Sequence, residues 1–247
     1  MKLAILSDTH GNLVALDAVL TELKKESIEH MVCLGDVSAM GPQPHECLQR
    51  IQELNMPVVL GNTDYWLIDP SSIPADDVPI FNIMRWCATQ MTGTDHAFLE
   101  KFQATVDVKL SDEKSLLCFH GSPTDFNGII MSTSPDEEFL NHFSNRNDTL
   151  YTGGHTHVQL LRRVGEKLYL NPGSIGLPCQ YYPNLHGGLS LMHRAEYAVI
   201  TVEHDNMGID LRSIPLDIDL ILETAKNSKM PHVDWWQALW GKAPTKV

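Results

Sequence analysis

The sequence predicts an α/β fold, and the alternation of apolar and amphipathic segments in its first 60 residues carries that prediction. Apolar segments typical of strands occur at 2–6, 31–34 and 58–60, and amphipathic segments typical of helices separate them. This alternation favours parallel strands joined by right-handed crossovers. The 247 residues suffice for a substantial core. No linker, repeat or low-complexity tract divides the chain, so we expect a single domain over 1–247 with a C-terminal helical tail at about 215–247.

The first two predicted helices each place apolar residues along one face. In the segment 12–26, leucine and valine recur at the three- and four-residue spacing of a helix, and Asn12 can cap its start. The same spacing relates the apolar residues from Cys47 to Leu54 in the second helix. Each helix therefore has one apolar side available for burial.

The middle of the chain differs from this beginning. Three prolines followed by a helical stretch indicate a helical insert near 65–104, and a second insert spans 122–147. The short strand-like segments around them lie close together in sequence, which favours hairpins and antiparallel pairing. We expect these strands at 105–110, 115–119, 149–152, 158–163, 167–170, 188–193 and 197–204.

The predicted tail holds a helix near 217–227 and a tryptophan-rich segment. On a helix, Trp236, Leu239 and Trp240 would share one face through their three- and four-residue spacing. Because exposed tryptophan is costly, we expect this face to pack on the protein's own core. A homodimer contact through the same segment is the alternative.

Composition limits the partners and the location of the protein. No apolar run approaches the roughly 20 residues that span a membrane. The apolar N-terminal stretch meets Asp8 at once, which indicates a first strand and not a signal peptide. Five cysteines without close pairing fit a reducing cytoplasm, and the net charge of −13 would repel duplex nucleic acid. We therefore expect a cytoplasmic protein that binds neither duplex nucleic acid nor membranes.

Polar residues gather where the predicted strands end. Five strands are each followed by at least one Asp, Asn or His beside a glycine, namely Asp8, His10, Asp36, Asn62, His120, His155 and His157. Each motif alone is also typical of a capped turn or an Asx turn, and a single histidine is more often a hydrogen-bonded core or rim residue. Because α/β sheets gather their chemistry at the carboxyl ends of their strands, the joint pattern predicts one shared site.

The residue types narrow the kind of site. Two carboxylates, four histidines and one amide oxygen make a mixed oxygen and nitrogen set without cysteine. That set suits Mn²⁺, Fe²⁺ or Fe³⁺, Zn²⁺, Co²⁺ or Ni²⁺ better than Ca²⁺ or a structural thiolate zinc. Seven ligands exceed the needs of one tetrahedral ion. They suit two divalent transition metal ions that share a bridging carboxylate, with manganese favoured.

The motifs resemble those of the calcineurin-like metallophosphoesterase superfamily, in the family's order. The matching segments are Asp8-x-His10, Gly35-Asp36, Gly61-Asn62, His120-Gly121 and Gly154-His155-Thr156-His157, and Asn171-Pro172-Gly173-Ser174 resembles a turn of its small bacterial and archaeal members. The resemblance implies an αββα sandwich of two mixed β-sheets flanked by helices, and a binuclear metal site.

Carried over position by position, the resemblance implies two ligand sets that share Asp36. One metal would take Asp8, His10, Asp36 and His157, and the other would take Asp36, Asn62, His120 and His155. It also implies catalytic roles for Asp36, Asn62 and His155, and attack on phosphorus by a hydroxide that bridges the metals. The positive pocket around two such ions would attract a small phosphorylated substrate.

Thr63 departs from the family pattern, because many members have a histidine there that is thought to protonate the leaving oxygen. A threonine hydroxyl is too weak an acid for this role, so substrates with poor leaving groups should suffer most. This favours hydrolysis of phosphodiesters or activated phosphomonoesters. The alternatives are a phosphoprotein or nucleotide phosphatase, and a catalytically weak scaffold of the same fold.

Two questions stay open around Thr63. Asp64 would normally orient the missing histidine; here we expect a turn residue or a hydrogen bond to a neighbouring loop. The candidates for a histidine that replaces this acid are His186, His96 and His142, with solvent exposure as the alternative for each.

Overall fold

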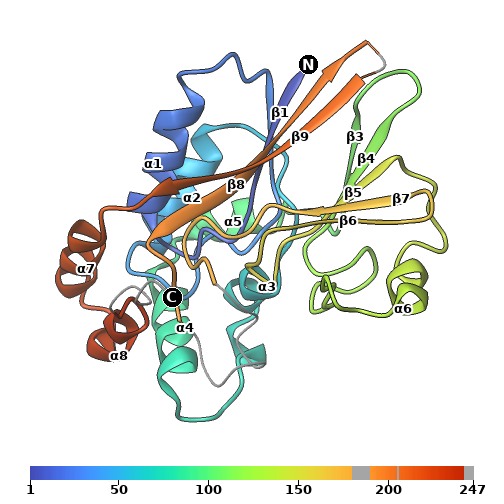
Figure 1. Ribbon diagram of the computed structural model, residues 1–247. Coiled ribbons are helices and arrows are strands. Elements are labelled where there is room, and N and C mark those ends of the chain that lie inside the picture. The colour runs from blue at the N-terminus through green and yellow to red at the C-terminus, as the bar shows by residue number, and fades with distance from the viewer. Residues whose placement is uncertain (180–189, 205, 242–247) are drawn as a thin grey trace.

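The computed structural model describes residues 1–179, 190–204 and 206–241, and its strands form two sheets (Figure 1). The first sheet has the order β2-β1-β8-β9, with β1 at Lys2–Leu6, β2 at His30–Cys33, β8 at Arg194–Glu203 and β9 at Asn206–Pro215. The second has the order β3-β4-β5-β7-β6, with β3 at Val106–Lys109, β4 at Ser115–Cys118, β5 at Leu150–Thr152, β6 at Leu160–Val164 and β7 at Lys167–Asn171. Strands β1 and β2 pair in parallel, as the sequence predicted.

Helices lie on the outer sides of both sheets (Figure 1). The first sheet is flanked by α1 (Leu13–Leu23), α2 (Pro44–Glu53), α7 (Ile218–Asn227) and α8 (Val233–Ala238). The second sheet is flanked by α6 (Asp136–Asn141), which packs against β6. The predicted insert near 65–104 is helical and comprises most of α3 (Asn62–Ile68), a 3₁₀ turn at Pro70–Ser72, α4 (Pro79–Gln90) and α5 (Gly93–Leu99).

Strand β1 shows how the layers arise. Successive side chains of a strand point to opposite faces, so Ala4 and Leu6 join the core beneath the helices, whereas Leu3 and Ile5 join the core between the two sheets. A third cluster, which includes Phe139 of α6, fills the outer face of the second sheet. The layers are therefore helices, sheet, sheet and helix, which confirms the predicted α/β sandwich.

Three sequence predictions about strands need correction. The segment 58–60 is not a strand, because Val58 and Val59 form only single bridges to two different partners, Cys33 and Gln103, before α3 begins at Asn62. Pairing is parallel between β4 and β5 and between β5 and β7. A long connection that contains α6 precedes β5, and β6 runs antiparallel to β7 before it, so that both strands return in the same direction. In the described part of 188–193, only Leu191 pairs, with Cys179.

Strand β9 was missed by the sequence prediction and pairs along its ten residues with β8. The described part of the tail after it, up to residue 241, contains the helices α7 and α8, as expected. Trp236 and Trp240 are buried in the core beneath the helices, and the Nε1–H of Trp236 donates to the carbonyl of Met40 at 2.7 Å. The homodimer contact stays a prediction. Among the described residues, no helix combines the length and the apolar character needed to cross a membrane.

Candidate metal centre

The seven residues predicted as ligands lie together at one end of the two sheets. They come from the loops that follow β1, β2, β4 and β5 and from the first residue of α3. Three of them, Asp8, His10 and His157, place one ligand atom each within 4.8 Å of one another. Asp36, His120 and His155 form a second group of the same kind.

In the first group, two histidine rings turn the same nitrogen toward a carboxylate. The Nδ1 atoms of His10 and His157 lie 3.0 and 2.8 Å from the carbonyl oxygens of Ala39 and Leu177, respectively, so each Nδ1 carries a proton and donates it. The two Nε2 atoms then face the Asp8 carboxylate, that of His157 at 3.2 Å and that of His10 at 3.7 Å. This is how an outer hydrogen bond orients a metal-binding histidine.

The second group repeats this arrangement. The Nδ1 of His120 lies 2.8 Å from the carbonyl of Leu34, and its Nε2 lies 3.3 Å from Asp36 Oδ2 and 3.1 Å from Asn62 Oδ1. The same Oδ2 of Asp36 is 3.6 Å from the Nε2 of His10 in the first group. Asp36 is therefore the carboxylate that faces both groups, and Asn62 belongs to the second.

Five of these residues have a left-handed backbone. The φ angles are 54° for Asp8, 48° for His10, 52° for Asp36, 64° for His155 and 57° for His157. For residues other than glycine this conformation costs about 1–2 kcal/mol each, and such strain gathers at functional sites. The neighbouring glycines are needed for space, because a Cβ at Gly61 would collide with Asp36 Oδ1 and one at Gly154 with Asp8 Oδ2.

The carboxylates and imidazoles of the site shift one another's pKa values. Burial would raise the pKa of Asp8, but His157 and His10 hold it well below its usual range, and His120 does the same for the pKa of Asp36. Despite its own burial, His120 has a pKa raised to about 9 by Asp36. Burial and the nearby His120 lower the pKa of His155 to about 4. Asp8 Oδ1 is buried and accepts no hydrogen bond from the described residues. Ionised carboxylates, inward-facing imidazoles and this oxygen are a donor set that fits divalent metal ions.

Asp64, whose role the sequence left open, is fully buried and binds backbone N–H groups. Its Oδ2 accepts from Asp36 at 2.7 Å and from Gly61 at 3.1 Å, and its Oδ1 accepts from Val37 at 2.9 Å. Burial, together with the charge of Asp36, nevertheless raises the pKa of Asp64 to about 7. The expectation of a hydrogen bond to a neighbouring loop is confirmed.

Thr63 is also buried, with 2% of its surface exposed. Its backbone N–H donates to Asp36 Oδ1 at 2.9 Å, and within the described ranges its hydroxyl has no hydrogen-bond partner. Thr63 thus contributes to the site through its backbone.

Some residues around the first group had no predicted role. Ser7 donates a short hydrogen bond from its hydroxyl to Asp8 Oδ2. The Oγ of Ser174 donates to the carbonyl of Asp8 at 2.8 Å, and the Nδ2 of Asn171 donates to the carbonyl of Gly154 at 2.7 Å. The segment from Asn171 to Ser174 resembles a turn of the family, whereas nothing in the sequence distinguishes Ser7.

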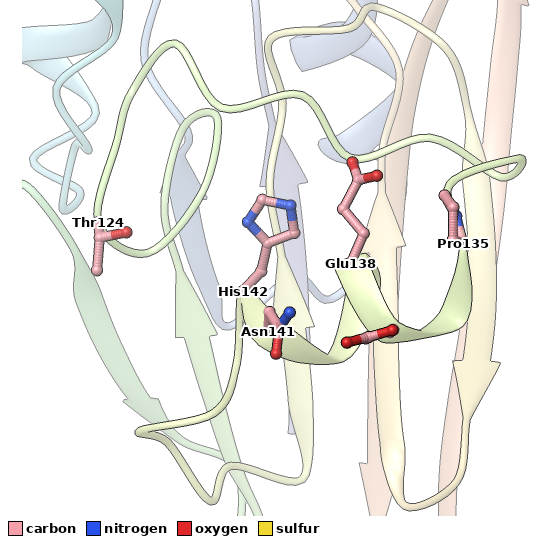
Figure 2. A pocket seen from close by; sticks show the side chains of 6 residues that line it. Thr124, Pro135, Glu138, Asn141 and His142 are labelled. Atoms are coloured by element: carbon pink, nitrogen blue, oxygen red, sulfur yellow. The ribbon is translucent and has the colours of Figure 1, made fainter.

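The three candidate histidines lie in different places. His186 is outside the described residues. His96 is half-buried in α5, and His142 follows α6 and lines a pocket with Thr124, Glu138 and Asn141 (Figure 2). Neither His96 nor His142 forms a hydrogen bond with the seven clustered residues, all of which lie in the described ranges. Their role as replacement acids stays a prediction.

Comparisons with known proteins agree with this geometry. A sequence model of the calcineurin-like phosphoesterase superfamily domain matches residues 1–203. An uncharacterized protein of Methanocaldococcus jannaschii is 25% identical in an alignment 245 residues long. The alignment covers 93% of this chain and 94% of that protein.

Two solved structures share the fold. A hypothetical protein of Pyrococcus horikoshii has a TM-score of 0.80 and 23% identity, with 98% of this chain and 99% of the other covered. A metallophosphoesterase of Sphaerobacter thermophilus has a TM-score of 0.72 and 24% identity, with coverages of 97% and 99%. These structures confirm the two-sheet fold.

Proposed function

Since this chain belongs to the calcineurin-like phosphoesterase superfamily, we propose that it is a hydrolase of phosphodiesters or activated phosphomonoesters that uses two divalent metal ions. One observation carries the proposal: Asp36 Oδ2 lies 3.3 Å from the Nε2 of His120 and 3.6 Å from the Nε2 of His10. A carboxylate in this position is suited to bridge two ions. We favour Mn²⁺, which accepts this mixture of oxygen and nitrogen ligands.

The residues of each group are proposed to hold one ion, with Asp36 shared. The first set is Asp8, His10, Asp36 and His157, and the second is Asp36, Asn62, His120 and His155. When bound, such ions lower the pKa of a water molecule and neutralise the charge of a phosphoryl group. The chain's own contribution is orientation, since backbone carbonyls fix the rings of three of the four histidines.

Three of these residues are proposed to act in the reaction itself. Asp36 places its negative charge between the two groups, and Asn62 places its amide oxygen in the second group. The lowered pKa of His155, about 4, keeps its imidazole neutral at pH 7, so that it can accept a hydrogen bond or bind a metal. Thr63 offers no acid for the leaving group, because a hydroxyl does not donate a proton at neutral pH. This supports substrates whose leaving groups depart without protonation.

Metal analysis and one pair of substrates test the proposal. The purified protein is expected to contain transition metal, to lose its activity with a chelator, and to regain it with Mn²⁺. The Mn²⁺-loaded protein should hydrolyse bis-p-nitrophenyl phosphate, and it should be much slower on an alkyl phosphomonoester. Absence of both bound metal and Mn²⁺-dependent hydrolysis would contradict the proposal. Efficient turnover of the alkyl monoester would instead favour a phosphatase.

A further inference from the structure

We infer that Asp64 is a positioning residue that sets the orientation of Asp36 and thereby the affinity for both metal ions; this inference rests on the function proposed above. The evidence is the set of hydrogen bonds between the turn that begins α3 and the loop that follows β2. The two segments are held together by the carboxylates of Asp36 and Asp64.

Both oxygens of the Asp64 carboxylate accept hydrogen bonds from backbone N–H groups. It accepts N–H groups from Asp36, Val37 and Gly61 at 2.7, 2.9 and 3.1 Å. Only Gly61 belongs to the turn of Asp64 itself, whereas Asp36 and Val37 lie 28 and 27 residues earlier in the chain. A residue that merely capped its helix would accept the N–H of Gly61 alone.

The side chain of Asp36 in turn accepts a hydrogen bond from the first turn of α3. Its Oδ1 accepts the N–H of Thr63 at 2.9 Å, which leaves its Oδ2 facing His120 and His10. The backbone of Asp36 is left-handed, with φ at 52°, a conformation that costs about 1–2 kcal/mol unless its surroundings hold it. The bond from its N–H to Asp64 provides that support. Asp64 therefore fixes both the backbone and the side chain of the shared carboxylate.

The contacts of Asp64 explain why this carboxylate is present without the histidine that it orients in many relatives. Its two oxygens are already occupied by the three N–H groups, and its side chain is 0% exposed. Outer groups of this kind usually change metal affinity by about 10–100-fold when they are altered.

Asp95 is a matched control for the structural part of this role. It occupies the same third position of a helix, α5, and accepts the N–H of Thr92 at 2.7 Å, as Asp64 accepts that of Gly61. It is also buried, with 2% exposed. Its remaining partners are the Thr92 hydroxyl and His45, and none of the seven clustered residues forms a hydrogen bond with it. Asp95→Asn thus weakens a helix start without touching the site.

The test is Mn²⁺ titration of chelator-treated protein by calorimetry, with thermal unfolding of the metal-free forms. We expect Asp64→Asn to weaken the binding of both Mn²⁺ ions by about 10–100-fold, and Asp95→Asn to leave the affinity unchanged. The metal-free forms of the two variants should lose similar amounts of Tm. Asp64→Glu keeps the charge and the helix cap but moves the carboxylate by one methylene. It should show a smaller loss of affinity at nearly the wild-type Tm.

Failure of the positioning role and failure of the proposed function give different results. Wild-type affinity in Asp64→Asn, or an equal loss in Asp95→Asn, would overturn the positioning role and leave the proposed function standing. Wild-type protein that takes up no Mn²⁺, Zn²⁺ or Co²⁺ would overturn the proposed function, and the inference with it. If Asp64→Asn does not fold, Asp64→Glu decides: weaker Mn²⁺ binding at an unchanged metal-free Tm supports the inference, and wild-type affinity overturns it.

Discussion

The Nε2 atoms of His10 and His157 lie 3.0 Å apart, although 147 residues separate the two histidines in the chain. His10 follows β1 in the first sheet, and His157 follows β5 in the second. The proposed first metal group therefore exists only when both sheets have packed together. Metal affinity in this protein should consequently report on the docking of the sheets as well as on the ligands themselves.

Asp36→Asn is expected to abolish hydrolysis and to weaken both metal ions together. Stabilisation by the metals is worth several kcal/mol, so turnover should fall by about 10³-fold or more. Metal content by mass spectrometry and turnover of bis-p-nitrophenyl phosphate are the measurements. The exposed Asp107 on β3 provides a control, and Asp107→Asn should behave as wild type. A variant that keeps two tightly bound ions would show that Asp36 is not shared.

Thr63→His is expected to increase phosphomonoester hydrolysis relative to that of activated diesters, because an imidazole can protonate a leaving oxygen. A positioned general acid contributes about 10²–10⁴-fold. We expect a smaller gain, about tenfold, since the Asp64 carboxylate that would orient the new ring already accepts three N–H groups. The ratio of kcat/KM for phenyl phosphate and bis-p-nitrophenyl phosphate measures the effect, with Thr63→Val as control. An unchanged ratio would contradict this reading of Thr63.

Asp95→Asn is expected to lower stability in a pH-dependent manner. Burial would raise the pKa of Asp95, but hydrogen bonds from Thr92 and the contact with His45 lower it below the usual value of 3.8. A lowered pKa in the folded state contributes stability above pH 3.8, and this contribution is lost as pH falls through the folded-state pKa.

Urea unfolding at several pH values measures this contribution. The wild type should exceed Asp95→Asn by about 1–2 kcal/mol at pH 7, and the difference should shrink below pH 4. A difference that grows on acidification would contradict the assignment.

Lys229→Gly is expected to stabilise the protein. Lys229 directly follows Ser228, the C-cap residue of α7. It is exposed and has a φ angle of 63°. Glycine adopts this conformation without steric penalty and is the preferred residue there. The net gain should be about 0.5–1 kcal/mol, after the greater freedom of glycine in the unfolded chain. Lys226→Gly, inside the same helix, is the control and should destabilise by about 1 kcal/mol. Loss of stability in Lys229→Gly would contradict the expectation.

The sequence predicted much of the fold because its strongest signals are local. Apolar periodicity located β1, α1, α2 and α7 to within a few residues. Strand β9 was missed because charged, polar and apolar residues mix in Asn206–Pro215, whose ten-residue pairing with β8 supplies the stability that its composition lacks. The parallel pairing of β4, β5 and β7 depends on which strands become neighbours in the sheet, and local patterns do not contain that information.

In the candidate site, too, the sequence predicted what depends on local pattern and missed what depends on contacts between distant segments. Strand ends located the seven clustered residues, because a polar residue beside a glycine after an apolar strand is visible in the sequence. The role of Asp64 was not visible, since its bonds to Asp36 and Val37 cross 28 and 27 residues. The support that Ser7 and Ser174 give to Asp8 likewise depends on tertiary packing.

The left-handed backbones of the proposed ligands imply a trade-off between stability and activity. At each such position a glycine would suit the backbone better than the aspartate or histidine that is present. Glycine variants of Asp8 or Asp36 should therefore be inactive and yet unfold at higher urea concentrations than the matching alanine variants. The same trade-off bears on protein design: a seven-residue site grafted onto another scaffold would need these unusual backbone angles as well as the side chains.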